Sequence, residues 1–535
     1  MPRRQANHFR KFGTGDRIFK LFLHDRMRAR DRVVKMPALG QGMQVLPGRG
    51  LWPGSRTTSV HKQMLADLAG RPVADVLGNE IQHHVSRGHA ARRQGKRGAS
   101  GWSYEDVLPY FRRSETAPET SDPLRGTGGP IRVTRPRLEP SSLAEAFVQA
   151  GGQAGYPVLR DFNSAQQEGF GPVERSTFGG KRQSASRTYL DPARSRPNLT
   201  VVTGALAQEI QLKGSRAQGV RYLLGNKSVE ARAERVVILA AGAIGSPHLL
   251  HLSGIGPARV LEDAGIKVRH ELPGVGENLN DHPDLVIQHR CLEPASIYPV
   301  TLPSRSWLAG AEWLMRGTGA ASTNHFEAGG FVRSRPGVEH PDLQFTFMPL
   351  SVVPGTVDIR REHSYQVHID LMRPRSRGHV RARSADPRHA PAILFNYLAE
   401  PADLVDLRES VTILREVLSQ PALSRFRGPE LFPGPGVNDK ASIDAWITET
   451  LETCYHPVGT CKMGNEHAEA VVVDPQCRVR GIEGLRVADA SIMPEIVSAN
   501  TNATAIMIGE KAADLIRGME APSAELDEMR ERHSP

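Results

Sequence analysis

The stretch RVVILAAGAIGSPHLLHLSGIGP, residues 235–257, decides the fold class of this chain of 535 residues. It opens with the continuous apolar run Arg235–Ala240, which is typical of a strand buried on both faces of a parallel sheet. Two glycines, Gly242 and Gly245, follow the run and predict a tight turn. A buried strand that leads straight into such a turn indicates an α/β architecture.

A helix is expected directly after this turn. Ser246 stands at an N-cap position, Pro247 at the first helical position, and Gly254 where the helix should end. This order places a helix N-terminus at the edge of a parallel sheet, where a dinucleotide usually lies. The sequence therefore predicts an α/β domain that binds a dinucleotide.

Farther along, the chain changes to a different pattern. Residues 340–350, 364–374 and 378–386 alternate apolar and polar side chains, as half-exposed antiparallel strands do. A last helix is expected over 504–519, after the polar sequence SANTNA. Near the other end, Ser103 is placed to cap a helix that follows it. These segments predict a second region built on an antiparallel sheet.

The charge is uneven along the chain. Residues 1–100 hold 20 of the 68 Lys and Arg but only 6 of the 58 Asp and Glu, so the net charge is +14 there and −4 over the remainder. A basic arm for nucleic acid is one reading of this segment. It contains no recognisable nucleic-acid-binding module, so we expect no nucleic-acid partner.

Several classes of protein are excluded by composition. No run of eighteen apolar residues exists, so we expect no transmembrane segment, although peripheral membrane contact stays open. The start of the chain has no apolar core segment and does not resemble a secretory signal. Four cysteines lie far apart without CxxC spacing, which argues against a zinc site or other metal site and fits a reducing cytoplasm.

At this point the motifs carry a family resemblance. The segment 242–256 resembles the second signature of the glucose–methanol–choline (GMC) oxidoreductases, which are FAD-dependent. Further landmarks follow in the expected order: ELPGVGENLNDHP (271–283), TNHFEAGGFVRS (323–334), SRGHVRARSADPRHAPAILFNYL (376–398), YHPVGTCKMG (455–464) and GLRVADASIMPEIVSANTNATAIMIGEKAADLI (484–516). The resemblance covers roughly 101–518 and is strongest to the choline dehydrogenase-like branch.

The resemblance implies a fold of two parts. An FAD-binding doubly wound domain would be joined to an α+β substrate domain built on an antiparallel sheet. We expect its ranges to be 99–290 for the FAD domain, 291–372 for substrate-domain strands and loops, and 373–518 for a C-terminal oxidoreductase region that returns to the FAD domain. Residues 1–98 form an atypical basic segment, and 519–535 a polar tail.

The N-terminal segment departs from the family, which begins with a strand, GxGxxG and a helix. The nearest candidate is FGTGDRI (12–18), where Ile18 replaces the third glycine and no apolar strand precedes it. Fragments of family-like sequence at 34–44, 75–78 and 86–90 are separated by arginine-rich text without periodicity. We therefore hypothesise that residues 1–100 are partly out of frame or come from a decayed gene.

The implied chemistry is oxidation of an alcohol CH–OH group by hydride transfer to flavin. His456 matches the family's catalytic histidine and would take the hydroxyl proton, since a histidine pKa of roughly 6.5 suits a base. Asn500 matches the second active-site position, and its amide would hold the substrate oxygen. Two alternatives stay open: His456 as a buried structural histidine, and Asn500 as a helix cap.

The resemblance also implies cofactor and substrate contacts. Tyr455, Phe326 and Glu327 could face a quaternary ammonium group through aromatic surface and a countercharge, or they could simply pack. A helix that begins just after Asn500 would point its positive dipole end at the flavin. The residues expected to contact FAD are Ala207, Gly242, Asp489, Ala490, Asn500 and Thr501.

The sequence leaves several functional questions open. The substrate could be choline-like or another primary alcohol, and the electron acceptor could be oxygen or something else. The oligomeric state is equally open. A competing hypothesis is a catalytically inactive relative that binds no FAD and acts, if at all, as an interaction protein. A lyase on the same fold is a further enzyme alternative.

Overall fold

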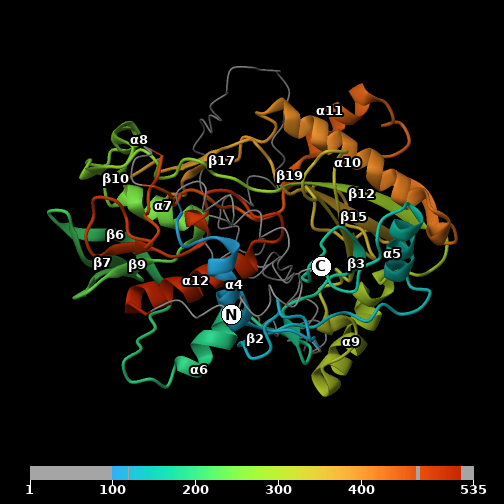
Figure 1. Ribbon diagram of the computed structural model, residues 1–535, viewed down its shortest axis with the longest axis horizontal. Helices are drawn as coiled ribbons and strands as arrows, with labels where there is room; N and C mark the ends of the chain where they lie inside the picture. Colours follow the sequence, from blue (N-terminus) through green and yellow to red (C-terminus); the bar gives the residue numbers. More distant parts are fainter. Residues whose placement is uncertain (1–98, 119, 466–469, 520–535) are drawn as a thin grey trace, which may run out of the picture.

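The computed structural model describes residues 99–118, 120–465 and 470–519, and Figure 1 shows their arrangement. The candidate phosphate loop and the hypothesised frameshift fall outside these residues. Two large apolar cores organise the described part. One lies beneath the segment that decides the fold class and contains Val237, Leu239 and Leu485. The other lies under the antiparallel sheet and contains Phe345, Val367 and Ile369.

The larger sheet is antiparallel, as the alternating segments predicted. Its strand order is β18-β12-β15-β14-β13-β3, and β19 also pairs with β12. The strands are β3 (Gly169–Pro172), β12 (Pro283–Cys291), β13 (Ala328–Val332), β14 (Leu343–Met348), β15 (Ser364–Leu371), β18 (Arg427–Phe432) and β19 (Glu452–Thr453). Two of them, β3 and β12, fall in the range 99–290 expected for the cofactor domain, so the chain crosses between the two parts more than once. The domain ranges themselves stay a prediction.

The two faces of this sheet have different partners. Phe345, Phe347 and Val367 belong to an apolar face that is covered by helices α5 (Leu143–Gln153), α10 (Pro401–Ser419) and α11 (Lys440–Thr450) (Figure 1). The opposite face carries polar side chains, yet these are also buried: Gln344, Thr346, Gln366 and Asp370. The prediction of half-exposed strands was therefore wrong for β14 and β15, because their polar face turns toward a buried site and not toward solvent. It holds for His379–Arg381, where only Val380 is buried.

The predicted buried strand belongs to one of three parallel strand pairs among the described strands. β9 (Val237–Leu239) pairs with β20 (Leu485–Val487), which brings two segments 248 positions apart into register. The expectation of a strand buried on both faces was wrong in part, since Ile238 is 44% exposed. Among the described strands, β9 pairs only with β20.

The helix after β9 begins earlier than expected. Helix α7 spans Gly242–Leu252, so Pro247 lies inside it and Ser246 does not cap it. An internal proline leaves the carbonyl four residues before it without its helical donor. That carbonyl, of Ala243, instead accepts a hydrogen bond from Thr460 Oγ1 at 2.5 Å. A hydrogen bond from the segment YHPVGTCKMG thus allows the proline to lie inside the helix. Gly254 ends the helix as predicted, and this glycine has a φ of 77°.

The terminal helix α12 (Asn502–Arg517) confirms the predicted last helix. It lies beside α4 (Tyr104–Ser114), whose Ser103 forms the expected N-cap (Figure 1). Arg113 joins the two helices by ion pairs to Glu510 at 2.8 Å and Asp514 at 2.7 Å.

The remaining elements are short or peripheral. A three-stranded antiparallel sheet contains β6 (Ala205–Lys213), β7 (Arg216–Leu224) and β8 (Lys227–Arg232). The other strands are β1 (Glu115–Thr116), β2 (Ile131–Arg132), β4 (Thr177–Phe178), β5 (Lys181–Arg182), β10 (Ile255–Gly256), β11 (His270–Glu271), β16 (His379–Arg381) and β17 (Ala392–Leu394), and the other helices are α6 (Asp191–Ala193), α8 (Ala258–Asp263) and α9 (Pro303–Arg316). Among the described residues, no helix is both long and apolar enough to cross a lipid bilayer.

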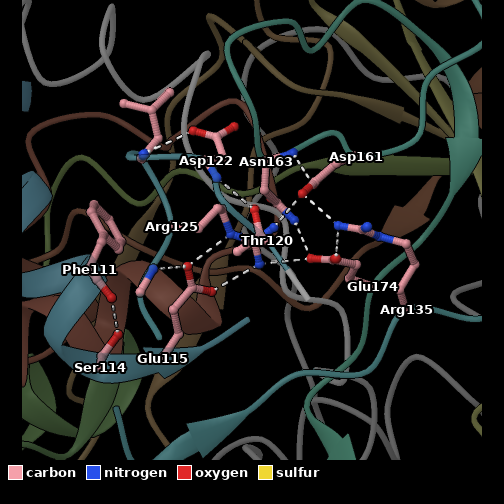
Figure 2. Close-up of polar contacts among 12 residues, drawn as sticks. Phe111, Ser114, Glu115, Thr120, Asp122, Arg125, Arg135, Asp161, Asn163 and Glu174 are labelled. Atoms are coloured by element: carbon pink, nitrogen blue, oxygen red, sulfur yellow. Dashed lines mark hydrogen bonds and ion pairs between the residues drawn. The ribbon is translucent and has the colours of Figure 1, made fainter. Parts of the chain in front are cut away.

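A buried ionic network ties the end of α4 to the edge of the larger sheet. Figure 2 shows Arg125 between Glu115, Asp161 and Glu174, at 2.9, 2.6 and 2.9 Å, with its side chain fully buried. Arg135 adds further pairs to Asp161 and Glu174. Burial raises the pKa of Glu174 although two guanidinium groups lie beside it. Glu115 follows α4 and Glu174 follows β3, so the network holds these distant segments together.

Candidate active site

His456 lies in the loop that follows β19, outside any helix or strand. The preceding Tyr455 has a φ of 65°, in the left-handed region that a tyrosine rarely adopts. The backbone N–H of His456 donates to Asp281 Oδ1 at 2.8 Å, and Thr453 and Tyr397 donate to Oδ2 of the same carboxylate. One buried carboxylate therefore holds the loop at Thr453 and at His456.

The imidazole of His456 has a partner at each nitrogen. Its Nδ1 lies 3.2 Å from Nδ1 of His282, and the two rings are nearly perpendicular, at 83°. Its Nε2 lies 3.3 Å from Nδ2 of Asn500. The structure thus brings together two residues that are 44 positions apart and that the sequence analysis assigned to one site.

The amide of Asn500 is held by the polar face of the larger sheet. Gln344, on β14, donates from Nε2 to Asn500 Oδ1 at 3.2 Å. Thr501 is the N-cap of α12 and makes no side-chain capping bond. Asn500 therefore does not act as the cap, because both ends of its amide bond side chains. The first-turn N–H groups of α12 remain next to it as donors.

Burial controls the charge of this cluster. It lowers the pKa of His456 to about 4 and that of His282 well below its ordinary value, with the neighbouring His456 as a further cause for His282. It raises the pKa of Asp281 to about 6, although the carboxylate accepts hydrogen bonds from Thr453 and Tyr397. At neutral pH both imidazoles are neutral.

Asp489 joins the ends of the two parallel strands. Its Oδ2 accepts from the backbone N–H of Gly242 at 3.0 Å and from Ser246 Oγ at 2.5 Å, and its Oδ1 accepts from Ser491 N at 2.8 Å. These residues follow β20 and β9, at the carboxyl edge where α/β sheets bind their ligands. The carbonyl of Ala490, in the same turn, accepts from Gly459 N.

The other predicted contact residues lie in three places. Ala207 is on β6, opposite Tyr222, and packs against the core under the parallel pair. Tyr455 is partly buried and packs against Ile244, Leu279 and Val380. The third place holds Phe326 and Glu327, immediately before β13.

Phe326 and Glu327 each have a neighbouring side chain that affects what they could bind. The ring of Phe326 meets the ring of His368 edge-on, with centroids 5.7 Å apart, and His368 Nδ1 lies 2.8 Å from Asp284 Oδ2. Glu327 lies 3.6 Å from the guanidinium of Arg175. The carboxylate that was expected to face a cationic substrate therefore already has a cationic neighbour.

Sequence reasoning missed His282, Asp281 and Gln344. The first two lie in the motif ELPGVGENLNDHP. Neither could be assigned a chemical role from the sequence, because their partners lie some 170 positions away. Gln344 belongs to the polar half of an alternating strand. Its signal was interpreted as solvent exposure, and only the packing of the loop before α12 shows the buried contact.

Known proteins are similar to this chain over most of its length. Two family models described as GMC oxidoreductase match residues 86–284 and 374–509. An oxygen-dependent choline dehydrogenase of Paraburkholderia phymatum is 47% identical over 436 residues, which cover 81% of this chain and 76% of the relative. The chain belongs to the GMC oxidoreductase family. A second oxygen-dependent choline dehydrogenase, from Escherichia coli O139:H28, is 48% identical over 79% of this chain and 76% of its own length.

Solved structures confirm the fold class. Pyridoxine 4-oxidase from Mesorbium loti superposes with a TM-score of 0.73 at 26% identity, covering 83% of this GMC chain and 82% of the other. A variant of Aspergillus oryzae formate oxidase gives a TM-score of 0.74 at 25% identity, with the same coverage. The α/β fold, the family and its cofactor FAD thus agree with the sequence analysis.

The described residues fit the flavin end of FAD. A Cβ at Gly242 would meet nothing within 4 Å, so the backbone beside Asp489 is open to a ligand. The first turn of α12 presents uncapped N–H groups and a positive dipole end, which suit an electron-rich ring. The stretch FGTGDRI, the nearest match to the family's phosphate loop, lies outside the described residues.

Proposed function

We propose that this GMC oxidoreductase oxidises the CH–OH group of a primary alcohol, and that His456 removes the hydroxyl proton. The main support for this proposal is that His456 Nε2 and Asn500 Nδ2 lie 3.3 Å apart. Both lie beside the N-terminus of α12, where the N-cap residue makes no side-chain capping bond. A base and a hydrogen-bond donor in this relation can act on one oxygen.

Each residue has a distinct part in the chemistry. Bound FAD supplies the hydride acceptor. His456 is neutral at physiological pH, so it can accept a proton at the nitrogen that faces Asn500. The Asn500 amide donates to the substrate oxygen and orients the carbon that loses hydride. The N-terminus of α12 favours negative charge at this place. Asp489, Ala490, Gly242, Thr501 and Ala207 are proposed cofactor contacts.

The substrate is proposed to be choline-like. The similar chains named oxygen-dependent choline dehydrogenase support this class. Phe326 offers an aromatic surface and Glu327 a carboxylate for a quaternary ammonium group. Arg175 partly neutralises the Glu327 carboxylate. The aromatic contact with Phe326 therefore contributes a larger share of the binding of the ammonium group than it would beside an unpaired carboxylate. A cytoplasmic location, expected from the cysteine pattern, belongs to the same proposal.

The test begins with colour. Purified full-length protein should be yellow or become yellow with added FAD, and choline should bleach it without oxygen. His456→Ala should retain the colour and slow bleaching by about 10²-fold or more, as expected for loss of a general base. His389→Ala, at an exposed histidine, should bleach at the original rate.

Two outcomes contradict the proposal. A colourless protein that takes up no FAD would support the inactive-relative hypothesis. Rapid bleaching of His456→Ala would remove the base assignment while leaving alcohol oxidation intact. Repeating the reduction with choline and its neutral analogues would separate choline-like from other primary alcohols, and admitting oxygen would show whether it accepts the electrons.

A further inference from the structure

We propose that His282 is a positioning residue that fixes the tautomer of His456, and that the Val497 carbonyl sets the direction of the whole hydrogen-bond chain. The inference rests on the proposed function, because it concerns which nitrogen of the proposed base is free to take a proton. Its geometric basis is a run of hydrogen bonds that joins the loops at 280–282, 454–460 and 496–501 to Gln344 on β14.

At one end of this series of hydrogen bonds, the donor and the acceptor are fixed by chemistry. The Val497 carbonyl oxygen lies 3.0 Å from His282 Nε2. A carbonyl oxygen can only accept, so Nε2 of His282 must carry the hydrogen. His282 is neutral, since burial lowers its pKa well below the ordinary value. A neutral imidazole has one N–H, so Nδ1 of His282 is an acceptor.

The donor and acceptor nitrogens of His456 follow from this assignment. Its Nδ1 is 3.2 Å from the acceptor Nδ1 of His282, so His456 must donate there. Because His456 is also neutral, its Nε2 has a free lone pair. That lone pair faces the amide of Asn500, whose Nδ2 donates to it at 3.3 Å.

The other end of the hydrogen-bond series is consistent with the same order of donors and acceptors. If Asn500 presents Nδ2 to His456, its Oδ1 must accept from the other side. Gln344 Nε2 stands there, at 3.2 Å, and also donates to Thr346 Oγ1 at 3.1 Å. Every link is then satisfied by one donor and one acceptor. The opposite tautomer of His456 would put a lone pair against a lone pair at His282.

No carboxylate can perform this role. Among the described residues, no hydrogen bond or ion pair joins a carboxylate to the ring of His282 or His456. Asp281 contacts the same loop, but it accepts the backbone N–H of His456 and the hydroxyls of Thr453 and Tyr397. The orienting partner is therefore a second histidine.

The first test needs neither flavin nor a variant of His282. In full-length protein labelled with ¹⁵N-histidine, the His456 resonances are identified by their loss in His456→Ala. We expect Nδ1 of His456 to be protonated and Nε2 unprotonated at pH 7. A hydrogen on Nε2 in the wild-type protein would overturn the inference.

The second test compares two replacements. His282→Asn keeps an acceptor oxygen near the position of Nδ1, whereas His282→Leu removes it. We expect His282→Leu to lower kcat at least about tenfold with little change in KM, within the roughly 10⁴-fold ceiling for losing the tautomer of a catalytic histidine. His282→Asn should recover most of the rate. His251→Leu, at a buried histidine bonded to the Val275 carbonyl, controls for general damage.

The outcomes distinguish the two proposals. A wild-type protein that oxidises no alcohol but shows the expected ¹⁵N pattern would defeat the proposed function and support the positioning role. Equal kcat values for His282→Leu and wild type, with His456→Ala inactive, would overturn the positioning role and keep the function. If His282→Leu does not fold, the wild-type tautomer and the His282→Asn rate still decide.

Discussion

Gln344 on β14 donates a hydrogen bond to Asn500, which immediately precedes the cap of α12, at 3.2 Å. This contact joins the antiparallel sheet to the helix that closes the FAD-binding part. The sheet therefore holds the amide that faces His456.

Replacing Gln344 by Leu should release the Asn500 amide from its orientation. We expect kcat/KM for the alcohol to fall by up to about tenfold, the effect of one hydrogen bond of 0.5–1.5 kcal/mol. Steady-state kinetics measure it. Gln288→Leu is a matched control, since Gln288 is buried on the same sheet and donates to the Val352 carbonyl. Equal losses in both variants would show that the effect is general destabilisation.

Replacing Glu327 by Gln should affect cationic substrates selectively. The carboxylate offers a countercharge to a quaternary ammonium group, while Arg175 at 3.6 Å reduces its strength. We expect KM for choline to rise about tenfold, equivalent to about 1.4 kcal/mol, and KM for its uncharged isostere 3,3-dimethylbutan-1-ol to stay unchanged. A parallel rise for both alcohols would mean that Glu327 shapes the site without reading charge.

Replacing Arg125 by Met should destabilise the fold strongly. The side chain is fully buried between three carboxylates (Figure 2), and its removal leaves them without that countercharge. Breaking a buried ion pair on one side costs about 3–5 kcal/mol. Urea unfolding followed by circular dichroism measures the shift in midpoint. Arg388→Met, which breaks the exposed pair with Asp386, should leave the midpoint unchanged.

Stability should fall as the pH drops from about 6.5 to about 4. Burial lowers the pKa of His248, His251, His325 and His456 to about 4, so the unfolded chain binds protons in this window more readily than the folded one. Each histidine contributes stability that is complete above pH 6.5 and lost as the pH falls, on the order of 3 kcal/mol if fully buried.

Asp281 works in the opposite sense, since its raised pKa of about 6 favours the folded state at lower pH. The histidines outnumber it, so the net slope should remain positive. Thermal unfolding at several pH values measures this slope, and His251→Gln should make it shallower. A melting temperature that is flat between pH 6.5 and 4 would contradict the buried neutral state of these rings.

Local chemistry could be predicted from sequence where neighbours in the chain decide it. The cap at Ser103 and the helix over 504–519 depend on contacts within one or two turns, and both are present. The start of α7 was wrong for the same reason. A proline normally begins a helix, but Thr460, more than two hundred positions away, satisfies the carbonyl that Pro247 frees.

The motifs occur in order and each requires particular side chains, so their order was enough to identify the family, its FAD cofactor and the candidate site residues. How these residues contact one another depends on the fold. A hydrogen bond needs two atoms about 3 Å apart, and sequence distance says nothing of that separation. Thus His282, Asp281 and Gln344 became site residues only when folding placed them around His456 and Asn500.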